Sequence, residues 1–277
     1  MRSAGDPAPG RAPGRQSLPA FFALVTAVSV PFWLLGAWID TTGEAPIGLP
    51  VSALMFVCPA VAASVLVHRR EGRAGVVRLL ARVADCSRAP RKGRYALAIG
   101  FMPAVVVTAV VLAGLSGAVP GGLPMPLTAA PVLAVVFLVA AAAEELGWTG
   151  YATDPMIRRW GELNTGVALG VFWGAWHLVP LVQAHHGALW IGGWFATTVA
   201  ARVVMVRLYL STGRSMLSTI CVHASLNVCA AMAPGYGLAR MSLIIGGLTV
   251  LVAVAATVLA AGAATRARNA LPDGTES

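Results

Sequence analysis

Long apolar runs alternate with short polar segments along the chain. Each run holds about 20 residues, the length that a helix needs to cross the hydrocarbon core of a bilayer. The pattern predicts membrane-spanning helices at residues 18–39, 50–67, 95–115, 126–151, 165–182, 188–208, 215–233 and 241–264. The predicted fold class is therefore all-α, a polytopic membrane protein built as a bundle of eight transmembrane helices.

The composition agrees with this class. Only 11% of the 277 residues are charged and 57% are hydrophobic, whereas soluble proteins carry about 25% charged residues. The net charge of +9 is compatible with nucleic-acid binding, but the basic residues gather between the apolar runs, which is typical of membrane orientation. We expect the lipid bilayer as a partner and no nucleic acid.

The basic residues also predict the orientation. Eight spans place both chain ends on one side, and of the 20 Lys and Arg residues only Arg240 falls outside that side. Arg202, Arg207 and Arg214 are counted there, at the inner end of the sixth span. The positive-inside rule then predicts an integral protein, of a bacterial plasma membrane, with its N and C termini inside.

The chain divides into one membrane domain and two tails. Residues 1–17 are rich in Pro, Gly and Ala and contain three Arg residues, and we predict a disordered basic tail there. Residues 18–264 form the predicted domain, and 265–277 a second disordered tail. The segment 68–94 holds nine basic residues and apolar residues at helical spacing, which predicts an amphipathic helix at an anionic membrane face.

Two adjacent acids stand where the chain should still be inside the membrane. Residues 129–143 carry no charged or strongly polar side chain, and Glu144 and Glu145 follow directly. An ionised carboxylate in hydrocarbon costs at least about 2.5–3.5 kcal/mol, so an acid at this depth indicates a functional site. His177 and His223 lie inside two later apolar runs.

These polar residues are predicted to meet. At about 1.5 Å per helical residue, they lie roughly 10–18 Å from the inner face. Asn227 lies at a similar depth, and it shares a helix face with His223 because the two are four residues apart. We therefore predict one intramembrane polar cavity, open to the cytoplasmic side.

At these residues the chain resembles the intramembrane CAAX-protease and bacteriocin-processing family, which includes the prenyl-protein endopeptidase of eukaryotes. The family carries Glu-Glu-x-x-x-Arg, Phe-x-x-x-His and His-x-x-x-Asn motifs on separate helices of an eight-span bundle. The corresponding segments here, in the same order, are Glu144-Glu145-Leu-Gly-Trp-Thr149, Trp173-Gly-Ala-Trp-His177 and His223-Ala-Ser-Leu-Asn227. The chain departs from the family at two positions, where Thr149 replaces the Arg and Trp173 replaces the Phe.

The resemblance implies an endopeptidase that cuts a membrane-associated protein or peptide. Glu144 would be the general base that activates a water, and His177 would orient that water. His223 and Asn227 would donate hydrogen bonds to the oxyanion, while Glu145 would orient the site. This glutamate mechanism requires no cofactor. A zinc-dependent version would use Glu144, His177 and His223 as ligands, although the chain has no HExxH helix.

The sequence also suggests three other kinds of protein. The segment 114–117 matches the Gly-x-Ser-Gly signature of rhomboid serine proteases, but its Ser116 falls at a predicted outer turn and precedes the His-x-x-x-Asn motif. A proton-coupled transporter should show broken helices or an internal repeat, and no such repeat is found. A catalytically impaired membrane scaffold is suggested by Thr149. The sequence does not identify the substrate.

Overall fold

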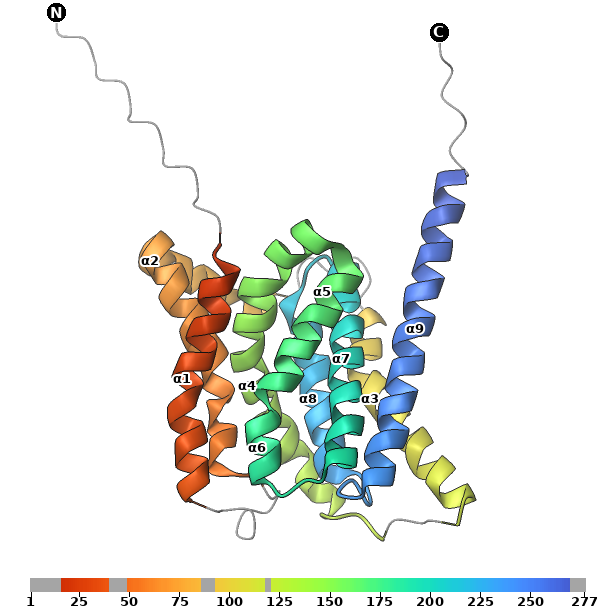
Figure 1. Ribbon diagram of the computed structural model, residues 1–277. Helices are drawn as coiled ribbons and strands as arrows, with labels where there is room; N and C mark the ends of the chain where they lie inside the picture. Colours follow the sequence, from red (N-terminus) through yellow and green to blue (C-terminus); the bar gives the residue numbers. More distant parts are fainter. Residues whose placement is uncertain (1–15, 40–48, 86–92, 118–120, 270–277) are drawn as a thin grey trace, which may run out of the picture.

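The computed structural model describes residues 16–39, 49–85, 93–117 and 121–269, and every regular element within these ranges is helical (Figure 1). The α-helices are α1 (Leu18–Trp38), α2 (Cys58–Ala81), α3 (Gly93–Leu115), α4 (Ala130–Gly147), α5 (Asp154–Trp176), α6 (Leu178–Gln183), α7 (Ala188–Ser211), α8 (Met216–Met232) and α9 (Ala239–Asn269). Short 3₁₀ segments lie at Val51–Val57, Arg82–Ala84 and Leu127–Ala129, and a π-helix at Trp148–Thr153.

The predicted membrane bundle is confirmed. In the described part of the chain, six helical stretches are long and apolar enough to cross a membrane, and α8 is a shorter apolar helix. One of the six, Leu127–Trp176, contains both α4 and α5, and its direction reverses at the terminal end, where α5 is kinked at Gly161 (Figure 1). With α4 and α5 counted separately and α8 included, the described residues make eight crossings. The start of α1 and the end of α9 lie at the same end of the bundle, which we call the terminal end (Figure 1).

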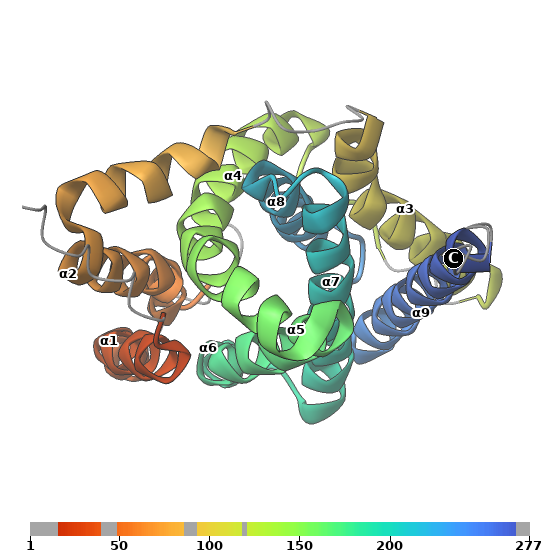
Figure 2. The ribbon, with the colours of Figure 1, turned by 90° about the horizontal axis from the view of Figure 1, so that it is seen from above.

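A central group of helices carries the polar residues. Seen from the terminal end, α4, α5, α7 and α8 lie in the middle, with α1, α2 and α6 on one side and α3 and α9 on the other (Figure 2). Large apolar side chains cover much of the outside, and on α4 the side chains of Val132, Val135 and Val139 are exposed. This surface suits contact with lipid, whereas the interior holds the charged groups.

Two glycines break the helices at the terminal end. Gly72 inside α2 and Gly161 inside α5 have φ of +65° and +77°, a conformation that glycine adopts without steric cost. After Gly72 the chain forms the helix expected within 68–94, and Leu79 of this helix is buried. After Gly161 the chain turns back into the bundle toward His177.

The last helix is longer than predicted. α9 continues to Asn269, five residues into the segment 265–277 that we predicted to be a disordered tail. The residues from Thr265 to Asn269 include neither Gly nor Pro, and the first Pro beyond them is Pro272, so nothing local ends the helix at residue 264. Most of both predicted tails lies outside the described residues.

Glycines allow the central helices to approach closely. A Cβ atom placed on Gly193 of α7 would lie 2.5–2.6 Å from the backbone of Ser242 and Leu243 in α9. On α5, Gly166 and Gly170 face the backbone of Val203 and Val199 of α7 in the same way, at 2.8 Å. Small residues at helix contacts are the usual means of close packing in membranes. They hold α7 between α5 and α9.

Replacing Gly193 by Ala should therefore destabilise the fold. Overpacking of a tight contact costs about 1–3 kcal/mol, because the backbone of α9 must move away. The matched control is Gly192→Ala, whose Cβ would meet no atom within 4 Å and which should be neutral or slightly stabilising. Thermal unfolding of the purified variants in detergent measures the difference. Equal melting temperatures for the two variants would contradict the close α7–α9 contact.

Candidate active site

The two adjacent glutamates sit at the end of α4 and point to different partners. Glu144 is 4% exposed and Glu145 is completely buried. The helix changes from α to π immediately after them, at Trp148–Thr153, a local widening that often marks functional sites.

One oxygen of Glu144 is held by two tryptophans. Its Oε2 accepts hydrogen bonds from Nε1 of Trp148 at 3.1 Å and from Nε1 of Trp173 at 2.8 Å. Trp173 stands where the family motif has Phe, so this position supplies an N–H donor that Phe lacks. The other oxygen, Oε1, lies 3.8 Å from Nε2 of His223, beyond normal hydrogen-bond distance. Oε1 is therefore free of a close protein donor within the described residues.

Glu145 lies in a dense polar cluster. Its two oxygens accept hydrogen bonds from Nη1 and Nη2 of Arg202 at 2.8 and 2.9 Å. The hydroxyl of Thr149 donates to Oε2 at 2.5 Å, and Nδ1 of His223 lies 3.0 Å from Oε1. The guanidinium of Arg202 also lies over the ring of Trp173, 4.3 Å from its centroid. A buried carboxylate needs such partners, because without them its desolvation would not be offset.

Arg202 corrects the sequence analysis in two ways. We counted it among the basic residues of the inner face, but its side chain is completely buried in α7. The family motif has an Arg at the position of Thr149, so the sequence lacks a cation there. Arg202 supplies a cation to Glu145 from a different helix, α7. The signal was present in the sequence, since an arginine inside the apolar run 188–208 is itself an intramembrane charge and so a candidate functional residue.

His177 is held by a backbone carbonyl and surrounded by aromatic rings. Its Nδ1 lies 2.9 Å from the carbonyl oxygen of Trp173, so Nδ1 must carry the proton and Nε2 of the neutral ring is left as an acceptor. The rings of Trp176 and Trp194 lie with their centroids 4.7 and 5.3 Å away. This environment orients the imidazole, which is half-buried.

His223 and Asn227 lie one turn apart on α8, as predicted, but their surroundings differ. His223 is 2% exposed and contacts both glutamates. Asn227 is half-buried, lines a pocket, and makes no side-chain hydrogen bond to any described residue. Asn227 is therefore the member of the pair whose amide is available to a bound molecule.

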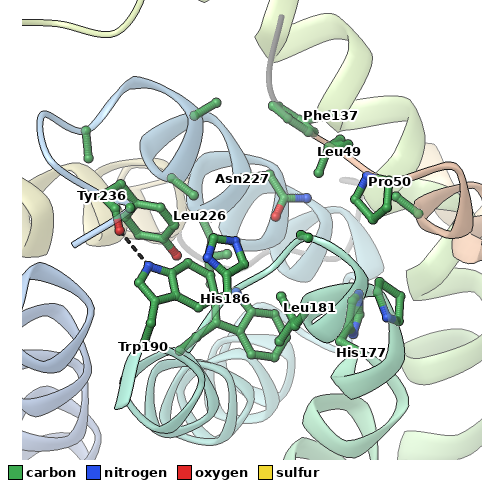
Figure 3. Close-up of a pocket in the computed structure, with 18 of the residues that line it drawn as sticks. Leu49, Pro50, Phe137, His177, Leu181, His186, Trp190, Leu226, Asn227 and Tyr236 are labelled. Carbon is green, nitrogen blue, oxygen red and sulfur yellow. Dashed lines mark hydrogen bonds between the residues drawn. The ribbon is translucent and has the colours of Figure 1, made fainter. Parts of the chain in front are cut away.

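The pocket joins three of the five predicted site residues. It has a volume of about 760 Å³ and is lined by Glu144, His177 and Asn227 together with mainly apolar side chains. Figure 3 shows His177 and Asn227 among the residues around it. Glu145 and His223 lie behind Glu144 and do not line it. The structure thus brings all five together, with Glu144 as the link between the pocket and the buried cluster. The volume is typical of small-molecule or peptide sites.

The pocket reaches one end of the bundle. Its outer lining comes from the loops around Pro50, Met125, His186 and Tyr236, which lie at the end of the bundle away from the terminal end. The described lining therefore reaches the end of the bundle away from the basic loops, while the side of the membrane that this end faces stays a prediction from the basic residues. Counting residues along single helices gives depth, but it does not tell at which end the helices separate.

The rhomboid-like serine does not take part in this site. The hydroxyl of Ser116 donates to the carbonyl of Ala113 at 2.8 Å and accepts a hydrogen bond from Arg240. It is not among the residues that line the pocket, and no histidine in the described ranges is bonded to it. The match at residues 114–117 therefore has no catalytic partner here.

The residues named for zinc are not arranged as a metal site. Within the described segments, no group of three or more His, Cys, Asp or Glu side chains has the geometry to hold a metal ion. Nδ1 of His177 faces a carbonyl oxygen, and one oxygen of Glu144 is used by two indole N–H groups. We therefore derive no chemical step through a metal.

Two comparisons with known proteins bear on this site. Residues 126–229 match a family model described as Type II CAAX prenyl endopeptidase Rce1-like. The chain is also 28% identical over 142 residues to a Methanococcus maripaludis protein named CAAX prenyl protease 2, an alignment that covers 46% of this chain and 52% of the relative. The chain thus matches about half the length of that curated relative. The family match contains the five predicted site residues, and the resemblance that their motifs indicated is confirmed.

Proposed function

We propose that this protein is an intramembrane endopeptidase that hydrolyses a peptide bond of a membrane-associated protein or peptide. The observation that carries the proposal is the setting of Glu144, whose carboxylate closes the inner end of an apolar pocket and keeps Oε1 free of a close donor within the described residues. The match to an endopeptidase family over residues 126–229 supports the same reaction class.

In the proposed reaction, Glu144 is the general base. A water between Oε1 of Glu144 and Nε2 of His177 loses its proton to Glu144 as its oxygen attacks the carbonyl carbon of the substrate. Asn227 donates a hydrogen bond from its amide to the carbonyl oxygen as that oxygen becomes negative. The C–N bond then breaks, and Glu144 returns the proton to the leaving nitrogen.

The buried cluster keeps this base in place. Arg202 and Thr149 hold Glu145, and Glu145 in turn accepts from Nδ1 of His223, which orients the ring so that its Nε2 faces Glu144. This arrangement supports Glu145 as a positioning residue. It also supports a change in the role of His223, from the oxyanion donor inferred from the motif to a partner that steadies Glu144.

The pocket residues give the direct test of this proposal. Asn227→Ala should lower kcat about 10²–10³-fold, because removal of one oxyanion donor has that effect in other hydrolases. The matched control is Asn164→Ala, at an exposed asparagine on α5, which should leave kcat unchanged. Cleavage of quenched fluorescent apolar peptides by protein in lipid nanodiscs measures both. Equal activity of the two variants would remove Asn227 from the mechanism.

The zinc-dependent version of the same reaction is the second candidate, favoured only by the presence of two histidines near Glu144. It predicts one bound zinc per protein and loss of activity in a chelator, with recovery on adding zinc. The glutamate mechanism predicts full activity in the chelator and no stoichiometric metal in the purified protein. Elemental analysis together with the nanodisc assay separates the two.

A further inference from the structure

The end at which the pocket opens carries a consequence for the substrate. We propose that the substrate enters from the face opposite the basic loops, the extracytoplasmic face, and that it is an uncharged, apolar segment of a membrane-inserted or exported protein. This inference rests on the proposed function, because it assumes that the pocket binds a substrate. Its evidence is the shape of the pocket and the distribution of charge.

The lining runs in one direction from the site on each helix that contributes to it. From Glu144 it follows α4 backward through Ala140 and Phe137 to Met125, and from Asn227 it follows α8 forward through Ala231 to Tyr236. From His177 it continues through Leu181 and Ala184 to His186. All three paths lead to loops at the end of the bundle opposite the terminal end (Figure 1).

The terminal end is closed by packing. A Cβ on Gly147 would lie 2.5–2.8 Å from Pro59 of α2, and a Cβ on Gly150 would lie 2.9 Å from Leu79 and 3.3 Å from Met216. Nη1 of Arg82 donates to the carbonyl of Gly150 at 2.7 Å. Helices α2, α4 and α8 therefore pack closely at these points. The groove at the terminal end, which is lined in part by Arg82 and Gly150, is lined by none of Glu144, His177 and Asn227.

The charges place the closed end inside the cell. The described basic residues at the terminal end, a set that excludes the buried Arg202, include Arg69, Arg70, Arg73, Arg78, Arg82, Arg94, Arg158, Arg159, Arg207, Arg214 and Arg266. At the opposite end the described residues include a single one, Arg240. An asymmetry of this size orients membrane proteins with the basic loops in the cytoplasm. The mouth of the pocket then faces outward.

The walls indicate an apolar occupant. Among the described residues that line the pocket, Glu144 is the one carboxylate and there is no Lys or Arg. At the mouth, the ring of His186 stacks on Trp190 with centroids 3.6 Å apart, and Trp190 donates to the carbonyl of Tyr236 at 2.7 Å. Burial lowers the pKa of His186 below its ordinary value, so the ring is uncharged at neutral pH. A negatively charged segment would find no counter-charge among these residues, and a positively charged one would find only Glu144 at the inner end of the pocket.

Cysteine labelling tests the side of access without depending on enzymatic activity. Ala231→Cys lies in the pocket and Arg159→Cys lies in the basic groove at the terminal end, each introduced into a chain whose native cysteines are replaced by alanine. A membrane-impermeant maleimide is applied to spheroplasts and to inside-out vesicles. We expect at least tenfold faster labelling of Ala231→Cys in spheroplasts and of Arg159→Cys in inside-out vesicles.

Faster labelling of Ala231→Cys in inside-out vesicles, or no labelling from either side, would overturn the proposal. Should Ala231→Cys fail to accumulate, Ala184→Cys in the loop at the mouth carries the same expectation. The peptidase assignment would survive a failure here, since Glu144→Gln and Asn227→Ala test it separately. Conversely, outward access would stand even if those variants showed that the protein is not a peptidase.

Discussion

Glu144→Gln is expected to lower peptide hydrolysis about 10²–10⁴-fold while leaving the protein folded and inserted. Glutamine has the same shape, and its amide oxygen can still accept from Trp148 and Trp173, but it cannot take a proton from water. General-base catalysis contributes a factor of this size. Initial rates on apolar fluorogenic peptides in nanodiscs, with melting temperature as the folding check, measure the effect.

The control for this change is Glu162→Gln. Glu162 pairs with Arg207 at the surface of the bundle, at 2.9 Å, and both side chains are about one-third exposed. Loss of such a pair has little effect on stability and should have none on the rate. A Glu144→Gln protein that keeps more than half of the wild-type rate would show that another group acts as the base.

Arg202→Met is expected to cause the largest loss of stability, about 3–5 kcal/mol. The change leaves the Glu145 carboxylate buried without its cation, and breaking a buried ion pair by removing one partner has a cost of that size. The double variant Arg202→Met with Glu145→Gln should recover most of the loss, because the buried charge is gone as well. Unfolding in denaturant, followed by circular dichroism, gives the free energies.

Position 149, where the family motif has Arg and this chain has Thr149, allows a more specific test of the same ion pair. Thr149 already donates to Glu145, so Thr149→Arg in the Arg202→Met background should return a cation to the same carboxylate and restore stability in part. Arg207→Met, at the surface pair with Glu162, is the matched control and should change stability by less than about 1 kcal/mol. If the variant with both Arg202→Met and Thr149→Arg is no more stable than Arg202→Met alone, Arg202 does more than pair with Glu145.

Much of the molecule follows from the sequence alone. The apolar runs predicted the eight crossings because each must satisfy its own backbone hydrogen bonds inside lipid, which only a helix of sufficient length can do. The motifs also located the site. Glu144, Glu145 and His223 are in contact and His177 and Asn227 share the pocket, as expected for rare polar groups that avoid lipid by facing one another.

What the sequence did not predict depends on how helices pack against each other. The partner of Glu145 comes from α7, 57 residues away in the chain, and no local pattern links the two positions. The opening of the pocket depends on where α4 and α8 separate and on the contacts of Gly147 and Gly150 that close the other end. The donor role of Trp173 became visible only when its indole was seen to reach Glu144 from α5.

The most direct test of the central claim compares membrane proteins from three strains: wild type, a deletion, and a strain carrying Glu144→Gln at the native locus. Mass spectrometry of protein N termini identifies cut products in each. We expect a set of new N termini within apolar, outward-facing segments that is present in wild type and absent from both other strains. Identical sets in the wild-type and Glu144→Gln strains would contradict it.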